Sequence, residues 1–229
     1  MTIKENIADI LRNIESARQR SPRAAAQVQL LAVSKTKPIE AVREAWSAGQ
    51  TWFGENRVQE LLPKQEALPE AKWHLIGHLQ TNKVKYIIGK TELIHSLDSI
   101  GLADEIEKRS AAAGVVTKCL VQVNIAEEEQ KSGLFVPELS SFIDAMADRP
   151  HVLIKGLMTI GPIVDDPEDI RPVFAELRRL FERERDRCLP FVDFQWLSMG
   201  MSHDYHIAVE EGANIVRVGS SIFGARQYN

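Results

Sequence analysis

Short apolar runs alternate along the chain with longer segments in which apolar residues recur every three or four positions. The runs have the length and composition of buried strands, and the longer segments have the period of amphipathic helices. Strands are predicted at 28–35, 51–54, 73–77, 93–97, 118–124, 152–158, 194–197 and 214–218. Helices are predicted at 38–48, 57–68, 79–87, 100–113, 137–147, 169–187, 204–211 and 221–225. A further amphipathic helix precedes the first strand and carries Ile3, Ile7, Ile10 and Ile14 on one face.

This alternation predicts an α/β protein with a single (β/α)8 TIM-type barrel, preceded by the extra N-terminal helix. The 229 residues match the usual size of such a barrel. Neither a linker nor a low-complexity segment divides the chain, so residues 1–229 are predicted to form one domain. An open doubly wound sheet is the alternative, but no G-x-G-x-x-G motif follows the first strand, as a dinucleotide-binding sheet would usually require.

Composition and charge exclude several classes of protein. The net charge of -4 gives no reason to expect a nucleic acid as partner. The two cysteines, Cys119 and Cys188, fit neither a disulfide framework nor a metal-binding spacing. No signal peptide is visible, and no apolar run approaches the ~20 residues of a membrane-spanning helix. We therefore expect a soluble cytoplasmic protein that binds neither a metal nor a membrane.

Lys35 ends the first predicted strand. Alternation places Leu31, Val33 and Lys35 on one side of this strand, so Lys35 extends an apolar stripe that faces the core. The carboxyl ends of barrel strands carry the ligand sites of this fold. A partly desolvated lysine there can condense with an aldehyde to form a Schiff base. The simpler interpretation is a lysine that ends the strand and extends to water.

The loops after the seventh and eighth strands predict a phosphate site. Gly200 and Ser202 lie in the first loop, Gly219 and Ser220 lie in the second, and the short predicted helix 221–225 follows. Barrels often bind phosphate at this place, where backbone N–H groups and small side chains let an anion approach. The same residues also suit ordinary turns and helix caps, so each loop alone decides little.

Arg217 relates Lys35 to the predicted phosphate loops. It lies on the same face of the eighth strand as Gly219, so it should point into the barrel, where a buried guanidinium needs an acceptor. A carboxylate on a neighbouring strand is one possible acceptor and a ligand is the other. A lysine, an arginine and a phosphate site on adjacent strands fit pyridoxal 5'-phosphate, whose aldehyde, ring nitrogen and phosphate they would bind in that order.

Several longer motifs extend this picture along the chain. They lie at 31–38, 53–56 with 58–60, 73–83, 131–133, 156–159, 197–202, and 216–219 with 222–226. Together they resemble the pyridoxal phosphate homeostasis protein family, also called YggS-like or proline synthase co-transcribed proteins. The resemblance covers essentially the whole chain.

The resemblance implies the barrel fold of alanine racemase, with Lys35 as the Schiff-base lysine of pyridoxal 5'-phosphate. It also implies a set of residues around the ring and the phosphate: Asn56, Met201, Ser202, Arg217, Gly219 and Ser220. Ser220 stands where threonine is frequent in the family, and serine keeps the hydroxyl donor. His78 stands at a variable position of its motif and is given no role. No catalytic residue and no metal ligand is predicted.

Two hypotheses of function follow. The resemblance implies a protein that holds and hands over pyridoxal 5'-phosphate in vitamin B6 and amino-acid homeostasis, without established turnover. The fold relationship suggests a racemase-like enzyme instead. Against the enzyme, the chain ends directly after the last barrel segment, and none of Tyr86, Tyr205 and Tyr228 is an obvious second base. A Schiff-base aldolase without cofactor would use the same lysine but matches no motif.

The remaining expectations concern partners. Pyridoxal-phosphate-dependent apoenzymes are the expected recipients of the cofactor, and the protein is expected to be a monomer. Lys131, in the polar loop after the fifth strand, is either a second transient amine during cofactor transfer or an ordinary solvated lysine.

Overall fold

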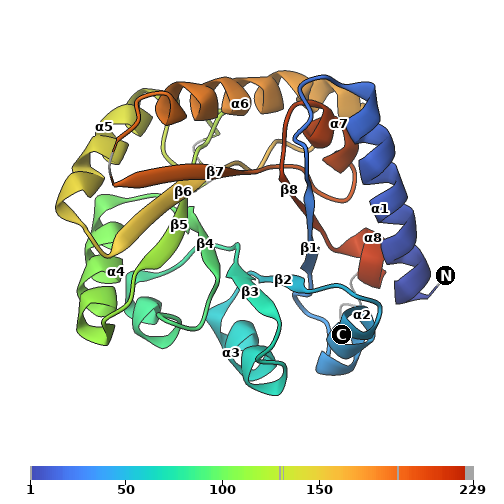
Figure 1. Cartoon of the computed structure of the whole chain (residues 1–229), viewed down its shortest axis with the longest axis horizontal. Helices are drawn as coiled ribbons and strands as arrows, with labels where there is room; N and C mark the ends of the chain where they lie inside the picture. Colours follow the sequence, from blue (N-terminus) through green and yellow to red (C-terminus); the bar gives the residue numbers. More distant parts are fainter. Residues whose placement is uncertain (1, 129, 131, 190, 225–229) are drawn as a thin grey trace.

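The computed structural model describes residues 2–128, 130, 132–189 and 191–224, and its strands form a closed barrel (Figure 1). Every strand pairs in parallel with the next one in the sequence, and β8 pairs with β1 to close the ring. The strands are β1 (Gln29–Val33), β2 (Trp52–Glu55), β3 (Lys72–Leu75), β4 (Leu93–Leu97), β5 (Thr117–Gln122), β6 (Val152–Met158), β7 (Val192–Ser198) and β8 (Ile215–Val218). The predicted (β/α)8 barrel is confirmed.

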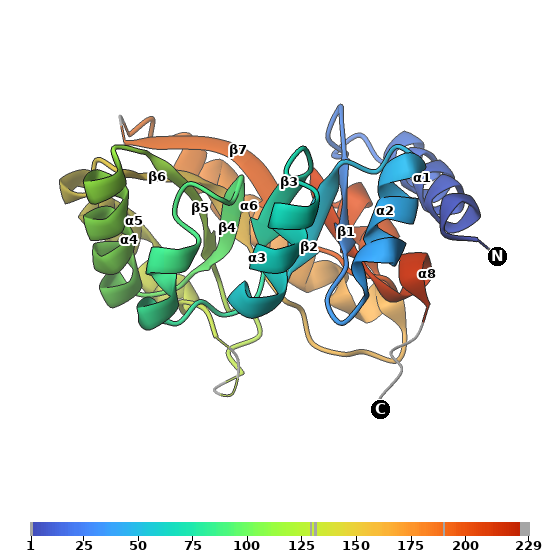
Figure 2. The same ribbon diagram turned by 90° about the horizontal axis from the view of Figure 1, so that it is seen from below.

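The helices form the outer layer, as Figures 1 and 2 show from two directions. The α-helices are α1 (Ile3–Arg20), α2 (Ile39–Ser47), α3 (Val58–Ala67), α4 (Ile100–Ala113), α5 (Leu139–Asp144), α6 (Arg171–Arg185), α7 (Tyr205–Glu210) and α8 (Ser220–Phe223). Short 3-10 helices complete the layer: η1 (Thr81–Tyr86), η2 (Val136–Glu138), η3 (Ala145–Asp148) and η4 (Pro167–Ile170). Most predicted boundaries differ from these by one or two residues, as is usual where helix ends fray.

Two predicted helices differ in kind from those observed. The segment predicted as a helix at 79–87 is the 3-10 helix η1, which covers six of these residues, and Gly89 follows it with a φ of 75°. The segment predicted at 137–147 is α5 with η2 before it and η3 after it. Both lie on the outside of the barrel, so these errors do not change the predicted architecture.

Alternation along the strands separates two apolar clusters. One contains Leu31, Val33, Ile76, Leu93, Leu120, Met158 and Ile215, with Trp52 and Trp196 packed against it. Since these residues come from strands all around a closed ring, this cluster fills the barrel interior. The larger cluster lies between the strands and the helices and includes Leu30 and Ala32 of β1. Residues of β1 thus alternate between the two clusters, as the sequence predicts.

The N-terminal helix α1 packs on the outside of the barrel beside α7 and α8 (Figure 1). Its buried face consists of Ile7, Ile10, Ile14 and Ala17. Polar contacts fix its position: Nδ2 of Asn6 donates to the carbonyl of Ile222 at 2.8 Å, and Nδ2 of Asn13 donates to the hydroxyl of Tyr205 at 3.2 Å. The extra helix therefore braces the last βα units of the barrel.

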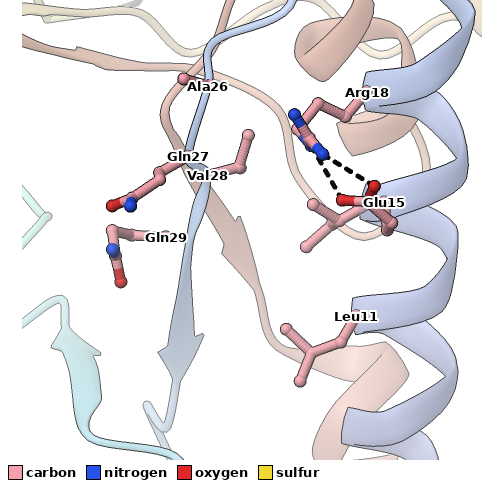
Figure 3. A pocket seen from close by; sticks show the side chains of 8 residues that line it. Leu11, Glu15, Arg18, Ala26, Gln27, Val28 and Gln29 are labelled. Atoms are coloured by element: carbon pink, nitrogen blue, oxygen red, sulfur yellow. Dashed lines mark hydrogen bonds and ion pairs between the residues drawn. The ribbon is translucent and has the colours of Figure 1, made fainter.

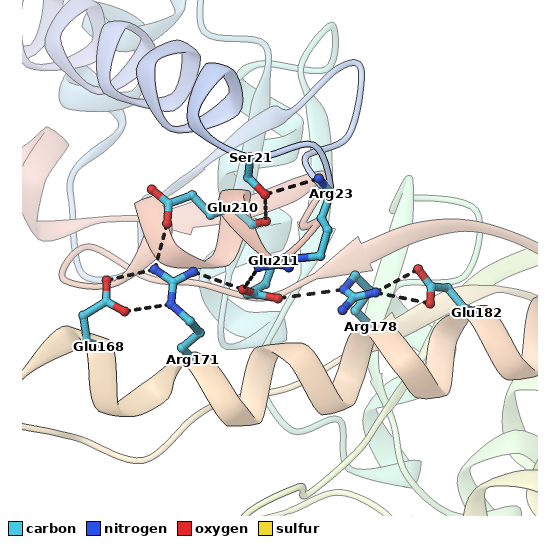
Figure 4. A network of polar contacts seen from close by, with 8 residues as sticks. All are labelled: Ser21, Arg23, Glu168, Arg171, Arg178, Glu182, Glu210 and Glu211. Atoms are coloured by element: carbon cyan, nitrogen blue, oxygen red, sulfur yellow. Dashed lines mark hydrogen bonds and ion pairs between the residues drawn. The ribbon is translucent and has the colours of Figure 1, made fainter.

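A charged network continues this bracing (Figure 4). The buried carboxylate of Glu211 accepts hydrogen bonds from Arg23 at 2.8 Å and from Arg171 at 3.0 Å. Arg171 also binds Glu210 at 2.8 Å, and the hydroxyl of Ser21 donates to the Glu210 carbonyl at 2.7 Å. The segment after α1 is thereby tied to α6 and to the end of α7.

None of the described helices has the length and apolar character needed to cross a membrane.

Candidate functional site

Lys35 lies in a turn directly after β1, which ends at Val33 and not at Lys35 as predicted. After Ser34 the backbone turns, with the N–H of Lys37 donating to the Ser34 carbonyl at 3.0 Å, and the Ser34 hydroxyl donates to Oε1 of Glu55 at 2.7 Å. Thr36 has a φ of 63°, which is uncommon for a β-branched residue, and its N–H donates to Oε2 of Glu60 at 2.7 Å. Such conformations persist where surrounding contacts hold them, often at functional sites. Lys35 is half-buried at the carboxyl end of the barrel.

A buried ion pair supports this turn from outside. Nζ of Lys64, on α3, donates to the Ser34 carbonyl at 2.8 Å and to Oε1 of Glu55 at 2.6 Å. The other carboxylate oxygen of Glu55, Oε2, has no hydrogen-bond partner among the described residues. Burial raises the pKa of Glu55, although the attraction of Lys64 opposes the shift. This pair anchors Ser34, the residue immediately before Lys35, and the periodicity of the sequence does not predict it.

The predicted phosphate loops lie side by side at the same end of the barrel. The backbone N–H of Gly219 donates to the hydroxyl oxygen of Ser202 at 3.2 Å, and the N–H of Arg217 donates to the carbonyl of Gly200 at 3.0 Å. Gly200 has a φ of 88°, and a Cβ atom there would lie 2.5 Å from that of Ala208. A side chain at position 200 is therefore excluded both by conformation and by space.

Gly219 connects these loops to β1. A Cβ atom on Gly219 would lie 3.1 Å from the carbonyl oxygen of Val33, two residues before Lys35. Gly219 precedes α8, and Ser220, its first residue, is exposed. Met201 and Ser202 are half-buried, and Oδ1 of Asp204 accepts the Met201 N–H at 2.5 Å. The structure thus brings the two loops together next to the end of β1.

Arg217 is buried inside the barrel, with an exposed fraction of 5%. Its Nη1 donates to the hydroxyl of Ser198 at 2.7 Å and its Nη2 donates to the carbonyl of Thr159 at 2.7 Å. Among the described residues it forms no salt bridge, so the carboxylate considered in the sequence analysis is not its partner. Burial lowers the pKa of Arg217 to about 10, against a smaller opposing effect of Asp204. The guanidinium remains charged at neutral pH and has further N–H donors for a ligand.

Asn56 follows β2 and lies against Gly77, whose missing side chain makes room for the Asn56 backbone. Asn56 also lines a cavity of about 530 Å³ between the start of α3 and η1. Arg57, Glu60, His78 and Lys83 contribute polar groups to its wall. This cavity opens beside the candidate site.

A second cavity, of about 330 Å³, lies between α1 and the start of β1 (Figure 3). Its wall includes Leu11, Val28 and Gln29, with the ion pair of Glu15 and Arg18 at the edge. It lies at the opposite end of β1 from Lys35 and includes none of the predicted site residues. Lys131, the other lysine considered in the sequence analysis, lies outside the described residues.

Comparison with known sequences gives the family. The sequence model for "Alanine racemase, N-terminal domain" matches residues 6–227. A protein of Aquifex aeolicus named "Pyridoxal phosphate homeostasis protein" is 46% identical over 233 residues, which cover 100% of both chains. The chain belongs to the pyridoxal phosphate homeostasis protein family. The resemblance of the sequence motifs to this family is thus confirmed over the full length.

Solved structures agree with this membership. The PipY protein of Synechococcus elongatus PCC7942, solved with PLP bound, is 36% identical, with a TM-score of 0.84 over 97% of this chain and 100% of that one. Alanine racemase from Corynebacterium glutamicum superimposes with a TM-score of 0.72 over 99% of this chain but 61% of its own, at 16% identity. The second likeness shows a common fold. For a pyridoxal phosphate homeostasis protein, the alanine racemase-like barrel is therefore the expected architecture.

Proposed function

We propose that this member of the pyridoxal phosphate homeostasis protein family binds pyridoxal 5'-phosphate and holds it as a Schiff base on Lys35. The observation that carries the proposal is the buried Arg217, a cation without a carboxylate partner among the described residues, beside the Gly200 and Gly219 loops and the end of β1. Ser198 and Thr159 accept from two of the N–H groups of Arg217, and a guanidinium has further N–H donors that a ligand can use. The relative solved with PLP bound supports the identity of the ligand.

Each group would meet one part of the cofactor. Nζ of Lys35 would attack the aldehyde carbon, and a C=N bond would replace the C=O bond with loss of one water. Arg217, which can only donate hydrogen bonds, would bind the ring nitrogen in its unprotonated form. Ser202, Gly219 and Ser220 would bind the phosphate through hydroxyl and backbone N–H groups, with Asn56 and Met201 beside the ring. The bound cofactor supplies an electrophilic carbon and an electron-accepting ring.

We further propose that the protein is a cytoplasmic carrier that acts in vitamin B6 and amino-acid homeostasis and passes the cofactor to apoenzymes. An unprotonated ring nitrogen is a weaker electron acceptor, which disfavours most carbanion chemistry other than racemisation and leaves storage unaffected. Tyr205, the tyrosine nearest the phosphate loops in sequence, has its hydroxyl bonded to Asn13 of α1 on the outside of the barrel. That position supports a carrier, because a second catalytic base would have to face the ligand.

The test begins with reconstitution. Purified protein mixed with pyridoxal 5'-phosphate should gain a visible absorption band. Borohydride reduction should abolish this band and fix the cofactor covalently to Lys35. Lys35→Ala should lose the band, while Lys90→Ala, which changes an exposed lysine, should keep it. A wild-type protein that gains no band would overturn the proposal.

A second measurement separates a carrier from an enzyme. The loaded protein is incubated with single enantiomers of amino acids, and the products are separated on a chiral column. A carrier should produce neither the opposite enantiomer nor a keto acid at catalytic rates. Turnover of either kind would favour the racemase-like alternative, which the fold likeness to alanine racemase suggests.

A further inference from the structure

A line of polar contacts crosses the otherwise apolar interior of the barrel and ends at Arg217. Nδ1 of His74 lies 2.9 Å from Nε2 of His95, and Nδ1 of His95 lies 3.1 Å from the Ser198 hydroxyl, which accepts from Nη1 of Arg217 at 2.7 Å. The four residues come from β3, β4, β7 and β8, and all are buried. Burying two imidazoles inside an apolar core costs free energy unless their ring nitrogens are hydrogen-bonded.

The donors and acceptors of these four residues fix the direction of the hydrogen bonds between them. Arginine can only donate, so the Ser198 oxygen is an acceptor toward Arg217 and its own hydrogen must go elsewhere. Nδ1 of His95 is the acceptor within reach. His95 then carries its proton on Nε2 and donates to Nδ1 of His74. This direction leaves the Nε2–H of His74 without a partner among the described residues. The opposite direction would leave two groups unpaired, the buried Ser198 hydrogen and the lone pair on Nε2 of His74.

The surroundings keep both imidazoles neutral. Burial lowers the pKa of His74 to about 3, and the charges of Lys72 and Lys118 add to the effect. Burial also lowers the pKa of His95 well below its ordinary value, with smaller contributions from His74 and Arg217. A neutral His95 can accept from the serine hydroxyl, and a charged one could not. The hydrogen bond to neutral His95 therefore holds the Ser198 oxygen as an acceptor toward the guanidinium of Arg217.

We infer that His95 is a positioning residue, which acts through Ser198 to fix the guanidinium of Arg217 for the cofactor, with His74 holding the His95 ring in place. Ser198 and the Thr159 carbonyl anchor the two terminal nitrogens, so the planar group cannot rotate. Its remaining donors then keep a fixed direction before the ligand arrives. The inference rests on the proposed binding of pyridoxal 5'-phosphate, whose ring nitrogen Arg217 would meet.

The first test needs no cofactor. Nuclear magnetic resonance of the protein with 15N-labelled histidine reports which ring nitrogen carries the proton. We expect His74 and His95 to be neutral with the proton on Nε2, and Ser198→Ala to shift the Nδ1 resonance of His95. A proton on Nδ1 of His95, or a charged His95 ring at pH 7, would overturn the inference.

The second test uses equilibrium titration with pyridoxal 5'-phosphate. His95→Leu and Ser198→Ala should each weaken binding about tenfold, the loss expected for one misplaced charged hydrogen bond. His95→Asn, whose side chain can still accept from Ser198, should bind within about threefold of wild type, whereas His95→Gln, which reaches only the His74 position, should not. The visible band of the saturated variants should persist, because Lys35 is unchanged.

Ile94→Ala is the control for general destabilisation, since Ile94 is buried on the same strand but packs toward the helices. It should bind like wild type. If wild type binds and His95→Leu and Ser198→Ala bind equally well, the inference fails and the proposed function stands. If wild type itself does not bind, the proposed function fails and the inference fails with it.

Discussion

Gly77 and Asn56 are in direct backbone contact: a Cβ atom on Gly77 would lie 2.3 Å from the carbonyl oxygen of Asn56 and 2.8 Å from its Cα. Both contacts are to main-chain atoms, which cannot turn aside as a flexible side chain would. The absent side chain of Gly77 therefore sets the position of Asn56 at the end of β2, beside the proposed ligand.

Gly77→Ala should displace Asn56. We expect a loss of about 1–3 kcal/mol in the free energy of unfolding, the usual cost of overpacking, and weaker binding of pyridoxal 5'-phosphate. Urea denaturation and equilibrium titration measure the two effects. Gly101→Ala is the matched control, because nothing lies within 4 Å of a Cβ there and the position is in α4. Alanine at 101 should stabilise the helix by about 0.5–1 kcal/mol. Equal effects at both positions would contradict the steric explanation.

Features that depend on the periodicity of apolar residues or on the composition of loops could be predicted from the sequence. Alternation in β1 predicted that Leu31 and Val33 share one face toward a core, and they lie together in the barrel interior. The barrel fold predicted that the loops after strands seven and eight meet, and they do. Both are local properties of strands and turns whose arrangement the barrel fold then fixes. The motifs also predicted the family, which the comparisons confirm.

The contacts that hold the site were not predicted. His95 and Ser198 are 103 positions apart and meet across the barrel interior. Periodicity says which face a side chain occupies, but not which residue on a distant strand it meets, because the stagger of the strands decides that. The ion pair of Glu55 and Lys64 was missed for a similar reason: each looks like an ordinary charged residue, and only the packing of α3 against β2 buries them.

Lys64→Met should lower the free energy of unfolding and destabilise the turn at Lys35, because it leaves the carboxylate of Glu55 buried without a cation. We expect a loss of about 3–5 kcal/mol at pH 8, as for other broken buried pairs. The double variant Lys64→Met/Glu55→Gln should recover part of that loss, since no uncompensated charge remains. Urea denaturation of the two variants and the wild type measures the difference. A double variant no more stable than the single one would contradict this account.

The loss in Lys64→Met should also depend on pH. Burial already raises the pKa of Glu55, and removing Lys64 takes away the main opposing influence. A carboxyl group whose pKa is raised on folding stabilises the folded state below the unfolded pKa, and this contribution disappears as the pH rises through the folded pKa. The difference between Lys64→Met and wild type should therefore be smaller at pH 5 than at pH 8. The reverse order would mean that Glu55 is not the source of the loss.

The histidine chain predicts that the whole protein loses stability in mild acid. The folded state lowers the pKa of His74 to about 3 and that of His95 in the same direction, whereas both titrate near 6.5 when unfolded. As the pH falls below about 6.5, His74 and His95 bind protons in the unfolded chain but stay neutral in the folded barrel. The free energy of unfolding therefore falls. His74 should contribute a slope of about 1.4 kcal/mol per pH unit between pH 6 and pH 4, and His95 should act in the same direction.

His74→Phe tests this directly, because it removes one titrating group and keeps an aromatic ring beside Trp52. The slope of unfolding free energy against pH should decrease by about 1.4 kcal/mol per unit, even though the variant is less stable at pH 7 through the lost bond to His95. Ile94→Ala should lower stability equally at every pH and leave the slope unchanged. Urea midpoints at several pH values measure both. An unchanged slope in His74→Phe would mean that the buried ring binds its proton as readily as in the unfolded chain, and the neutral hydrogen-bond chain to Arg217 would then lose its electrostatic basis.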